Sequence, residues 1–242
     1  MRRDHVRLGP GELIAYGHYG RPMLVFPSEQ GRAWDFENNG MVAAVADLIE
    51  DGRVKLYCVD SADAHSWSNQ SLPIEERARR HGDYEAWILD QVVPWVAGDC
   101  RGPTEIGTLG CSLGAYHAAN SVLKHADVFP LALCFSGNYD PTTWDAWGDP
   151  GDATYFNNPM AYVAHLHGDH LDWLRHRVSM LLVVGQGAWE EHPTRSLPGT
   201  RAFARLLAEK GIRHELDVWG YDTPHDWPAW QAQLRHHLPR FC

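Results

Sequence analysis

The segment that most constrains the fold of this chain is Gly110-Cys111-Ser112-Leu113-Gly114. It follows a short strand-like run at 105–109 and precedes a helix-forming run at 115–123. A G-x-S-x-G sequence between a strand and a helix forms a sharp turn that holds its central serine in a strained backbone conformation. The glycines remove the Cβ atoms that would clash between strand and helix. We therefore expect Ser112 to stand exposed as a nucleophile at the carboxyl edge of a sheet, with an idle serine in a glycine-rich turn as the alternative.

Strand-like and helix-like runs alternate along most of the chain, which predicts an α/β fold with a mostly parallel central sheet covered by helices on both faces. Several strand-like runs are continuously apolar, as buried parallel strands are. We expect strands at 12–16, 23–26, 54–59, 105–109, 131–136, 180–184 and 215–218. We expect helices at 41–50, at 74–93 with Pro94 as a stop or kink, at 112–123, at 201–210 with Gly211 as C-cap, and at 227–238.

The chain of 242 residues has no low-complexity tract and no visible repeat, so we expect a single domain over 1–242. Residues 137–177 break the alternation of strands and helices. We expect them to form a small, lid-like insertion over the carboxyl edge of the sheet, where folds of this class bind ligands.

Composition excludes several classes of partner. The formal net charge is −10 and the basic residues are scattered, so binding to nucleic acid or to an anionic membrane is not expected. No stretch approaches 18 apolar residues and no apolar run follows the basic start, so we expect a soluble, cytoplasmic protein. The five cysteines are odd in number and widely spaced, which fits free thiols in a reducing compartment. A homo-oligomer is compatible with the sequence.

A serine at such an elbow needs a base and an orienting acid, which follow it along the chain, each on a loop after a later strand. His225 follows the run at 215–218 and opens the last helix, so we expect it to be the base. A free imidazole has a pKa of about 6.5, which lets it accept and return a proton near neutral pH.

Four carboxylates compete for the role of the acid. Glu190 follows the strand at 180–184 and comes directly after Trp189, whose bulk can exclude water from the carboxylate. Glu191 runs on into a polar segment. Asp222 and Asp226 are close to His225 in sequence, and Asp226 is also placed to cap the helix that begins at residue 227. We expect Glu190 to be the acid and keep the other three as alternatives.

Several segments together resemble a known family. These are Val25-Phe-Pro-Ser28, Phe36-Glu-Asn-Asn-Gly-Met41, Lys55-Leu-Tyr-Cys-Val-Asp-Ser61, Ser66-Trp67, the elbow, Gly185-Gln-Gly-Ala-Trp-Glu190, Val218-Trp-Gly220 and His225-Asp-Trp-Pro-Ala-Trp230. They are similar to the putative esterase family, in the esterase D and enterochelin-esterase branch of the α/β-hydrolase fold. The resemblance covers nearly the whole chain and implies a cofactor-free serine carboxylesterase, with Ser112 as nucleophile, Glu190 as acid and His225 as base.

Such an enzyme also needs donors for the oxyanion of the intermediate. The Leu113 N–H lies at the start of the helix after the elbow, where the helix dipole favours negative charge. The resemblance places a second donor in a loop that is usually rich in glycine. This chain has Pro27-Ser28-Glu29-Gln30-Gly31 there, so the backbone N–H of Glu29 or Gln30 is the expected donor.

Aromatic side chains are candidates for a substrate pocket in this chain, which holds 11 tryptophans. We expect Trp67, Trp189 and Tyr155 to line it, with Trp144 and Trp147 as further candidates and ordinary packing as the alternative for each.

The remaining clusters predict no chemistry. His165, His167 and His170 lack the spacing that places two imidazoles on one helical face, so no metal site is expected. Cys111 should pack beneath the elbow rather than act as a nucleophile, and His117 should also pack. We expect no cofactor and a small ester as substrate. An acyltransferase with the same triad and a non-catalytic binding protein of the same fold remain alternatives.

Overall fold

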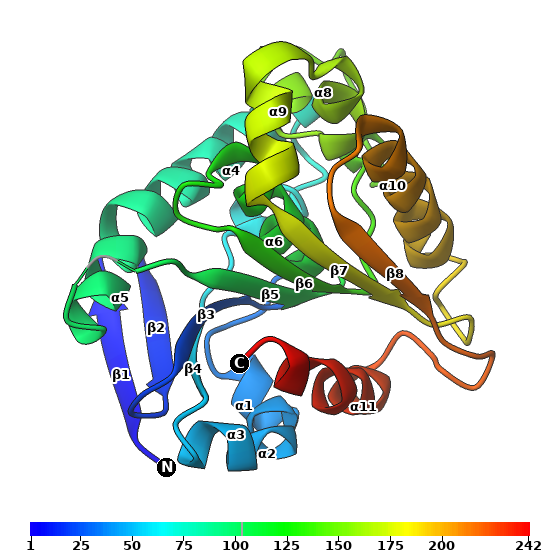
Figure 1. Ribbon diagram of the computed structural model, residues 1–242. Helices are drawn as coiled ribbons and strands as arrows, with labels where there is room; N and C mark the ends of the chain where they lie inside the picture. The colour runs from blue at the N-terminus through cyan, green and yellow to red at the C-terminus, as the bar shows by residue number, and fades with distance from the viewer. Residues whose placement is uncertain (103) are drawn as a thin grey trace.

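The computed structural model describes residues 1–102 and 104–242, and in them a single mixed sheet carries helices on both faces (Figure 1). The strands lie in the order β1-β2-β4-β3-β5-β6-β7-β8. The first two are antiparallel to their neighbours, and β3 to β8 run parallel to one another. Their bounds are β1 Arg3–Leu8, β2 Gly11–Tyr16, β3 Arg21–Phe26, β4 Val54–Val59, β5 Gly107–Cys111, β6 Leu131–Phe135, β7 Ser179–Val184 and β8 His214–Val218. The predicted α/β fold is confirmed.

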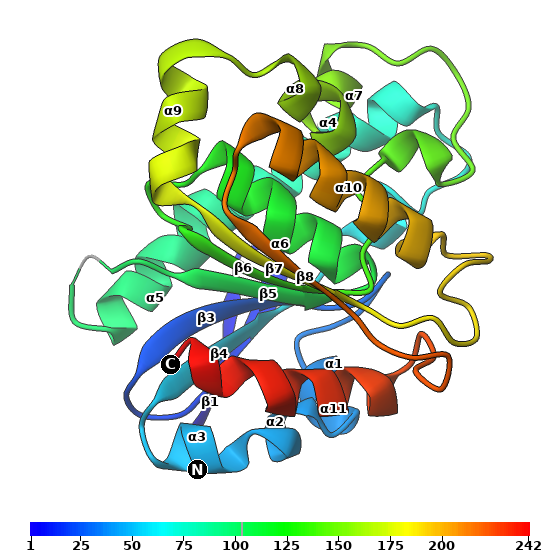
Figure 2. The ribbon, with the colours of Figure 1, turned by 45° about the vertical axis from the view of Figure 1, so that its right-hand side comes forward.

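Helices α1 to α3 and α11 cover one face of the sheet, and α4, α5, α6 and α10 cover the other (Figures 1 and 2). The first group is α1 Asp35–Asn38, α2 Met41–Ala44, α3 Ala46–Glu50 and α11 Trp227–His237. The second group is α4 Ile74–Trp87, α5 Val93–Asp99, α6 Leu113–Lys124 and α10 Ser196–Lys210. Short 3-10 turns are η1 Asp63–His65, η3 Pro141–Thr143 and η4 Leu238–Arg240. No helix in the described residues is long and apolar enough to cross a membrane.

The apolar strands supply both faces of the sheet with core residues. Along β6, Leu131, Leu133 and Phe135 belong to the core beneath α1–α3 and α11. Ala132 and Cys134 belong to the core beneath α4, α6 and α10. Successive side chains of a strand point to opposite faces, so a continuous apolar run fills two cores at once.

Four elements differ from the sequence-based prediction, one of them α10, which begins at Ser196 rather than at residue 201. β1 was not expected, because it is an edge strand whose charged residues interrupt any apolar run. The helix expected at 41–50 is divided at Val45, whose φ of −128° is not helical. The helix expected to stop or kink at Pro94 continues to Asp99 through a turn of π-helix at Ile88–Val92. Pro94 is the second residue of α5, and the turn of π-helix directly before it accommodates the proline, which has no N–H to donate.

The expected insertion contains η3, α7 Asp152–Phe156, α8 Pro159–His165 and α9 Gly168–Arg177. It starts at the carboxyl end of β6 and must reach the amino end of β7, so it crosses the face of the sheet that α4, α6 and α10 cover. Accordingly, α7 packs on α4, and α8 packs on α10 and α6 (Figure 2). The insertion therefore runs from the carboxyl end of β6 over α4, α6 and α10 to the amino end of β7. Glu75 on α4 accepts hydrogen bonds from the N–H groups of Gly151, Ala153 and Thr154, which fastens the start of α7.

Candidate active site

The elbow forms where β5 meets α6. Ser112 has φ 57° and ψ −122°, a conformation outside the regions that ordinary residues favour. A Cβ atom at Gly110 would lie 2.1 Å from the Gly114 carbonyl oxygen, and one at Gly114 would lie 2.4 Å from the Pro27 carbonyl oxygen. The two glycines therefore allow β5, α6 and the end of β3 to meet. The Ser112 N–H donates to the Phe135 carbonyl at 2.8 Å, which fixes the turn to β6.

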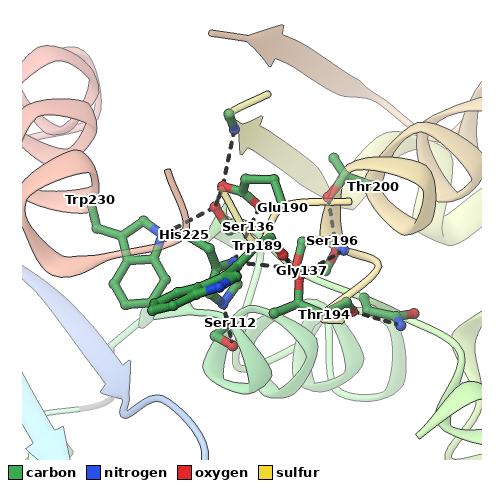
Figure 3. Close-up of polar contacts among 12 residues, drawn as sticks. Ser112, Ser136, Gly137, Trp189, Glu190, Thr194, Ser196, Thr200, His225 and Trp230 are labelled. Atoms are coloured by element: carbon green, nitrogen blue, oxygen red, sulfur yellow. Dashed lines mark hydrogen bonds and ion pairs between the residues drawn. The ribbon is translucent and has the colours of Figure 1, made fainter. Parts of the chain in front are cut away.

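The structure brings Ser112, His225 and Glu190 into one line of contacts (Figure 3). His225 Nε2 lies 2.9 Å from Ser112 Oγ, and His225 Nδ1 lies 3.2 Å from Glu190 Oε2. This is the geometry in which an imidazole with Nδ1–H directed at the carboxylate can accept the serine proton at Nε2. Three segments separated by 113 and 35 residues meet at the carboxyl ends of the parallel strands.

Two glycines explain how the loops of Glu190 and His225 come together. A Cβ at Gly185 would lie 2.0 Å from the Thr223 carbonyl oxygen, and one at Gly187 would lie 2.7 Å from the Pro224 nitrogen. The Gly-x-Gly segment therefore packs directly against the backbone before His225. The His225 N–H then donates to the Ala188 carbonyl at 2.9 Å.

Glu190 is fully buried, with 0% of its surface exposed. Its Oε1 accepts hydrogen bonds from Ser136 Oγ at 2.5 Å and from the Gly185 N–H at 3.2 Å, and its Oε2 faces His225. A buried carboxylate requires such partners, because removing it from water without them is costly. These contacts hold the Glu190 carboxylate in place beside the imidazole.

The three alternative acids lie elsewhere. Glu191 and Asp222 are exposed. Asp226 caps α11 by accepting the Ala229 N–H at 3.0 Å, as its position predicts. Of the four carboxylates considered, Glu190 is the one paired with His225.

Two further residues support the triad and were not predicted from the sequence. Ser136 follows β6, is buried, and has φ 54°. Trp230 on α11 donates its Nε1–H to Ser136 Oγ at 3.1 Å, and its ring meets the His225 ring edge to face at 4.9 Å. Trp230 belongs to the last motif of the family resemblance, which was the available signal. Ser136 ends an apolar strand and offered none. Together they link α11 and β6 to the acid and the base.

Cys111 packs beneath the elbow, as expected. It is buried, and burial raises the pKa of its thiol well above the ordinary value, with Cys134 nearby adding to the effect. A thiol that keeps its proton is a poor nucleophile. The other cysteines are also free.

The candidate oxyanion donors are main-chain groups of α6 and of the loop after β3. Leu113 is the first residue of α6, so its N–H has no partner within the helix. In the loop, the Gln30 N–H donates to Asp63 Oδ2 at 3.1 Å and is directed into the protein. This contact removes Gln30 from the two expected donors. Among the described residues the Glu29 N–H has no hydrogen-bond partner, which leaves it as the candidate.

The three expected pocket residues lie in different environments. Trp67 is only 2% exposed and packs against Tyr116, His81 and Trp144 in the core, so its assignment to a substrate pocket is wrong. An aromatic residue that follows a strand can line a pocket or pack in the core, and Trp67 packs in the core. Tyr155 on α7 packs against Phe156 and His165.

Trp189 is the expected pocket residue that accompanies the triad. It is 63% exposed, has φ 69°, and directly precedes Glu190. Figure 3 places its indole in front of His225. Of the two further candidates, Trp144 is packed on Tyr116, and Trp147 donates to the Gln70 carbonyl.

No group of three or more histidine, cysteine, aspartate or glutamate side chains in the described part of the chain is arranged to hold a metal ion. His165, His167 and His170 remain separate side chains on or beside α8 and α9.

Comparisons with known proteins place this geometry in a family. The family model described as "Putative esterase" matches residues 28–241. No curated protein matches the chain in sequence. Similar solved structures include a ferulic acid esterase, with a TM-score of 0.72, 16% identity, and coverage of 99% of this chain and 96% of that chain. They include MPT51 (FbpC1) of Mycobacterium tuberculosis, with a TM-score of 0.74, 14% identity, and coverage of 99% of this chain and 97% of that chain. They also include the S-formylglutathione hydrolase FrmB of Staphylococcus aureus, with a TM-score of 0.67, 11% identity, and coverage of 99% of this chain and 96% of that chain.

At these identities the solved structures support the α/β-hydrolase fold alone. The family model covers nearly the whole chain, and the chain therefore belongs to this family of esterases.

Proposed function

We propose that this protein is a serine carboxylesterase that hydrolyses small esters through an acyl-enzyme on Ser112, with His225 as base and Glu190 as acid. The observation that carries the proposal is the contact series Ser112 Oγ to His225 Nε2 at 2.9 Å and His225 Nδ1 to Glu190 Oε2 at 3.2 Å. The strained elbow and the buried carboxylate support it.

In the first half-reaction His225 accepts the proton of Ser112 as Oγ attacks the ester carbonyl. The negative charge that develops on the carbonyl oxygen is stabilised by the Leu113 N–H and the Glu29 N–H. His225 then protonates the departing alcohol, which leaves the acyl group on Ser112. Water repeats the attack with the same base, and the carboxylic acid is released.

The oxyanion donors contribute to the rate beside the triad. Loss of one such donor costs about 10²- to 10³-fold in kcat, because the donor is fixed before the charge develops. Both donors here are main-chain groups, so side-chain substitution cannot remove them directly. Their contribution depends on how the loop after β3 and the helix α6 are held.

Covalent labelling with a fluorophosphonate tests the nucleophile. We expect a mass shift on Ser112, no labelling of the variant Ser112→Ala, and labelling of the matched control Cys111→Ala. His225→Ala should be labelled far more slowly, because the proton of Ser112 then lacks an acceptor. Labelling of folded Ser112→Ala at the wild-type rate would overturn the assignment.

Substrate class is tested with p-nitrophenyl esters of graded chain length, beside a feruloyl ester and S-formylglutathione, the compounds in the names of two structural neighbours. Short acyl chains should be turned over fastest if small esters are the substrates. Product analysis with an added alcohol separates hydrolysis from acyl transfer. A new ester formed in preference to the free acid would favour the transferase.

A further inference from the structure

We propose that Asp63 is a positioning residue whose two carboxylate oxygens hold the two halves of the oxyanion site at a fixed separation. One oxygen binds the loop that carries the Glu29 N–H, and the other binds the helix that carries the Leu113 N–H. This inference rests on the proposed function, because it concerns the same oxyanion donors.

The loop half is held at the residue after Glu29. The Gln30 N–H donates to Asp63 Oδ2 at 3.1 Å, and Gln30 has φ 54°, a conformation that a non-glycine residue rarely adopts. The next N–H groups are also used, since Gly31 donates to the Ser28 carbonyl and Ala33 donates to Asp60. The Gly31–Ser28 hydrogen bond fixes the peptide unit that contains the Glu29 N–H, and the Gln30–Asp63 hydrogen bond fixes the next peptide unit, so the two together set the direction of the Glu29 N–H.

The helix half is held one turn inside α6. His117 lies four residues after Leu113, and its Nε2 lies 2.9 Å from Asp63 Oδ1. Successive turns of an α-helix move as one unit because hydrogen bonds join them. A contact at His117 therefore also restrains the first turn, where the Leu113 N–H has no partner within the helix.

The position of Asp63 makes it a rigid bridge. Asp63 and His117 are each about 1% exposed, so neither side chain is free to rearrange in water. The main chain of Asp63 is fixed as well, since its carbonyl accepts the N–H groups of Ser66 and Ser68. Among the described residues His117 Nδ1 has no hydrogen-bond partner, so the ring of His117 is held by Asp63 through Nε2.

Stability alone gives little reason to bury this pair. Burying polar side chains costs desolvation, and apolar side chains of similar volume at these two positions would avoid that cost. What an apolar pair cannot do is accept the Gln30 N–H. The bridge between loop and helix therefore accounts for polar residues at positions 63 and 117.

The test compares Asp63→Asn with Asp63→Ala in p-nitrophenyl acetate hydrolysis. An asparagine can accept the Gln30 N–H with its oxygen, and its nitrogen can donate to His117 Nε2 when the ring proton is on Nδ1, whereas alanine can do neither. We expect Asp63→Asn to retain kcat within about fivefold, and Asp63→Ala to lose about 10- to 100-fold in kcat with little change in KM, as misplacement of one donor would cause.

A transition-state analogue separates positioning from general instability. The affinity for a trifluoromethyl ketone, which forms an oxyanion on Ser112, should fall in Asp63→Ala by about the same factor as kcat/KM. The matched control is Thr108→Val, which removes buried hydrogen bonds from Thr108 to the Ala118 and Leu131 carbonyls. It should lower the melting temperature and leave kcat unchanged.

Amide hydrogen exchange tests the bridge without any enzymatic readout. The Gln30 amide should exchange slowly in the wild type and in Asp63→Asn, and faster in Asp63→Ala. Equal protection in all three proteins would overturn the proposal, as would an Asp63→Asn as impaired as Asp63→Ala. If Asp63→Ala does not fold, Asp63→Asn and His117→Gln still decide, since both should keep the Gln30 amide protected. A wild type that neither hydrolyses esters nor is labelled would refute the proposed function, while the exchange result would still decide the role of Asp63.

Discussion

Trp230 donates a hydrogen bond to Ser136, and Ser136 donates one to Glu190. This series of contacts predicts how the substitutions Ser136→Ala and Trp230→Phe change stability and kcat. Ser136→Ala removes the hydrogen bond that Ser136 Oγ donates to the buried Glu190 carboxylate at 2.5 Å. It also removes the acceptor of the Trp230 Nε1–H, which is 3.1 Å away. Alanine keeps a Cβ, so the strain at φ 54° is the same in both proteins. The substitution therefore isolates the loss of the hydroxyl group.

The magnitude follows from the burial of all three groups. A hydrogen bond to a charged group contributes about 1.5–3 kcal/mol, and a buried donor left without a partner costs about 1–3 kcal/mol. We expect Ser136→Ala to lower the free energy of unfolding by about 3–4 kcal/mol, and the melting temperature by about 10 °C for a chain of this length. If the Glu190 carboxylate loses about 1.5 kcal/mol of its support in the transition state, kcat falls about tenfold.

Trp230→Phe supplies the test, because phenylalanine keeps an aromatic ring against His225 and removes the N–H. In the wild-type background this change costs a hydrogen bond and the volume of the lost ring. In the Ser136→Ala background it costs the volume alone, since the hydrogen bond is already absent. The loss of unfolding free energy in the double variant should therefore be about 1–2 kcal/mol smaller than the sum of the losses in the two single variants. Urea denaturation of the four proteins measures this, and additivity within about 0.5 kcal/mol would refute the contact series.

Three further predictions concern charge. Glu190→Gln should lower kcat by about 10²- to 10⁴-fold and keep the fold, and Glu191→Gln should remain active; the reverse result in steady-state kinetics would show that the acid is misassigned. The value of kcat/KM should fall on acidification, as expected of an imidazole base, and a profile that stays flat wherever the protein is folded would contradict that base. Burial alone would raise the pKa of Glu85, but hydrogen bonds from His125 and Lys124 outweigh it and lower that pKa from 4.5 to about 2. The folded state thus gains about 3 kcal/mol from ionised Glu85 above pH 5 and loses it as the pH falls toward 2, so acid denaturation curves should be less steep for Glu85→Gln.

Much of the candidate site could be predicted because it depends on local chain order. Ser112, Glu190 and His225 each follow a strand of the parallel sheet, and the carboxyl ends of parallel strands meet at one edge. The sequence therefore indicated which side chains meet without any knowledge of their distances. Glu190 was preferred to Glu191 because the adjacent Trp189 could exclude water, but the structure leaves Trp189 63% exposed and holds Glu190 through Ser136 and Gly185.

The prediction for Trp67 was wrong because a tryptophan after a strand can either line a pocket or pack in the core. Trp67 and Trp189 both follow a strand, yet Trp67 is held in the core by Tyr116 and His81, while Trp189 is exposed beside the acid. The packing of Trp67 depends on side chains 49 and 14 residues away, which no local pattern records. Pro94 is a similar case, because a π-turn before it let the helix continue.

The side chains that support the triad could not be predicted either, because their sequence pattern is also ambiguous. Ser136 and Asp63 are short polar residues at the ends of strand-like segments, where exposed turn residues are also common. A helix gives a clearer signal, because the apolar periodicity of α6 identifies which positions face the core. His117 and Asn120 occupy such positions and are buried, with Asp63 and Tyr162 as their partners. A polar residue on the apolar face of the helix that follows a nucleophile therefore indicates a buried hydrogen-bond partner, and in this chain that partner leads directly to the loop that carries the second oxyanion donor.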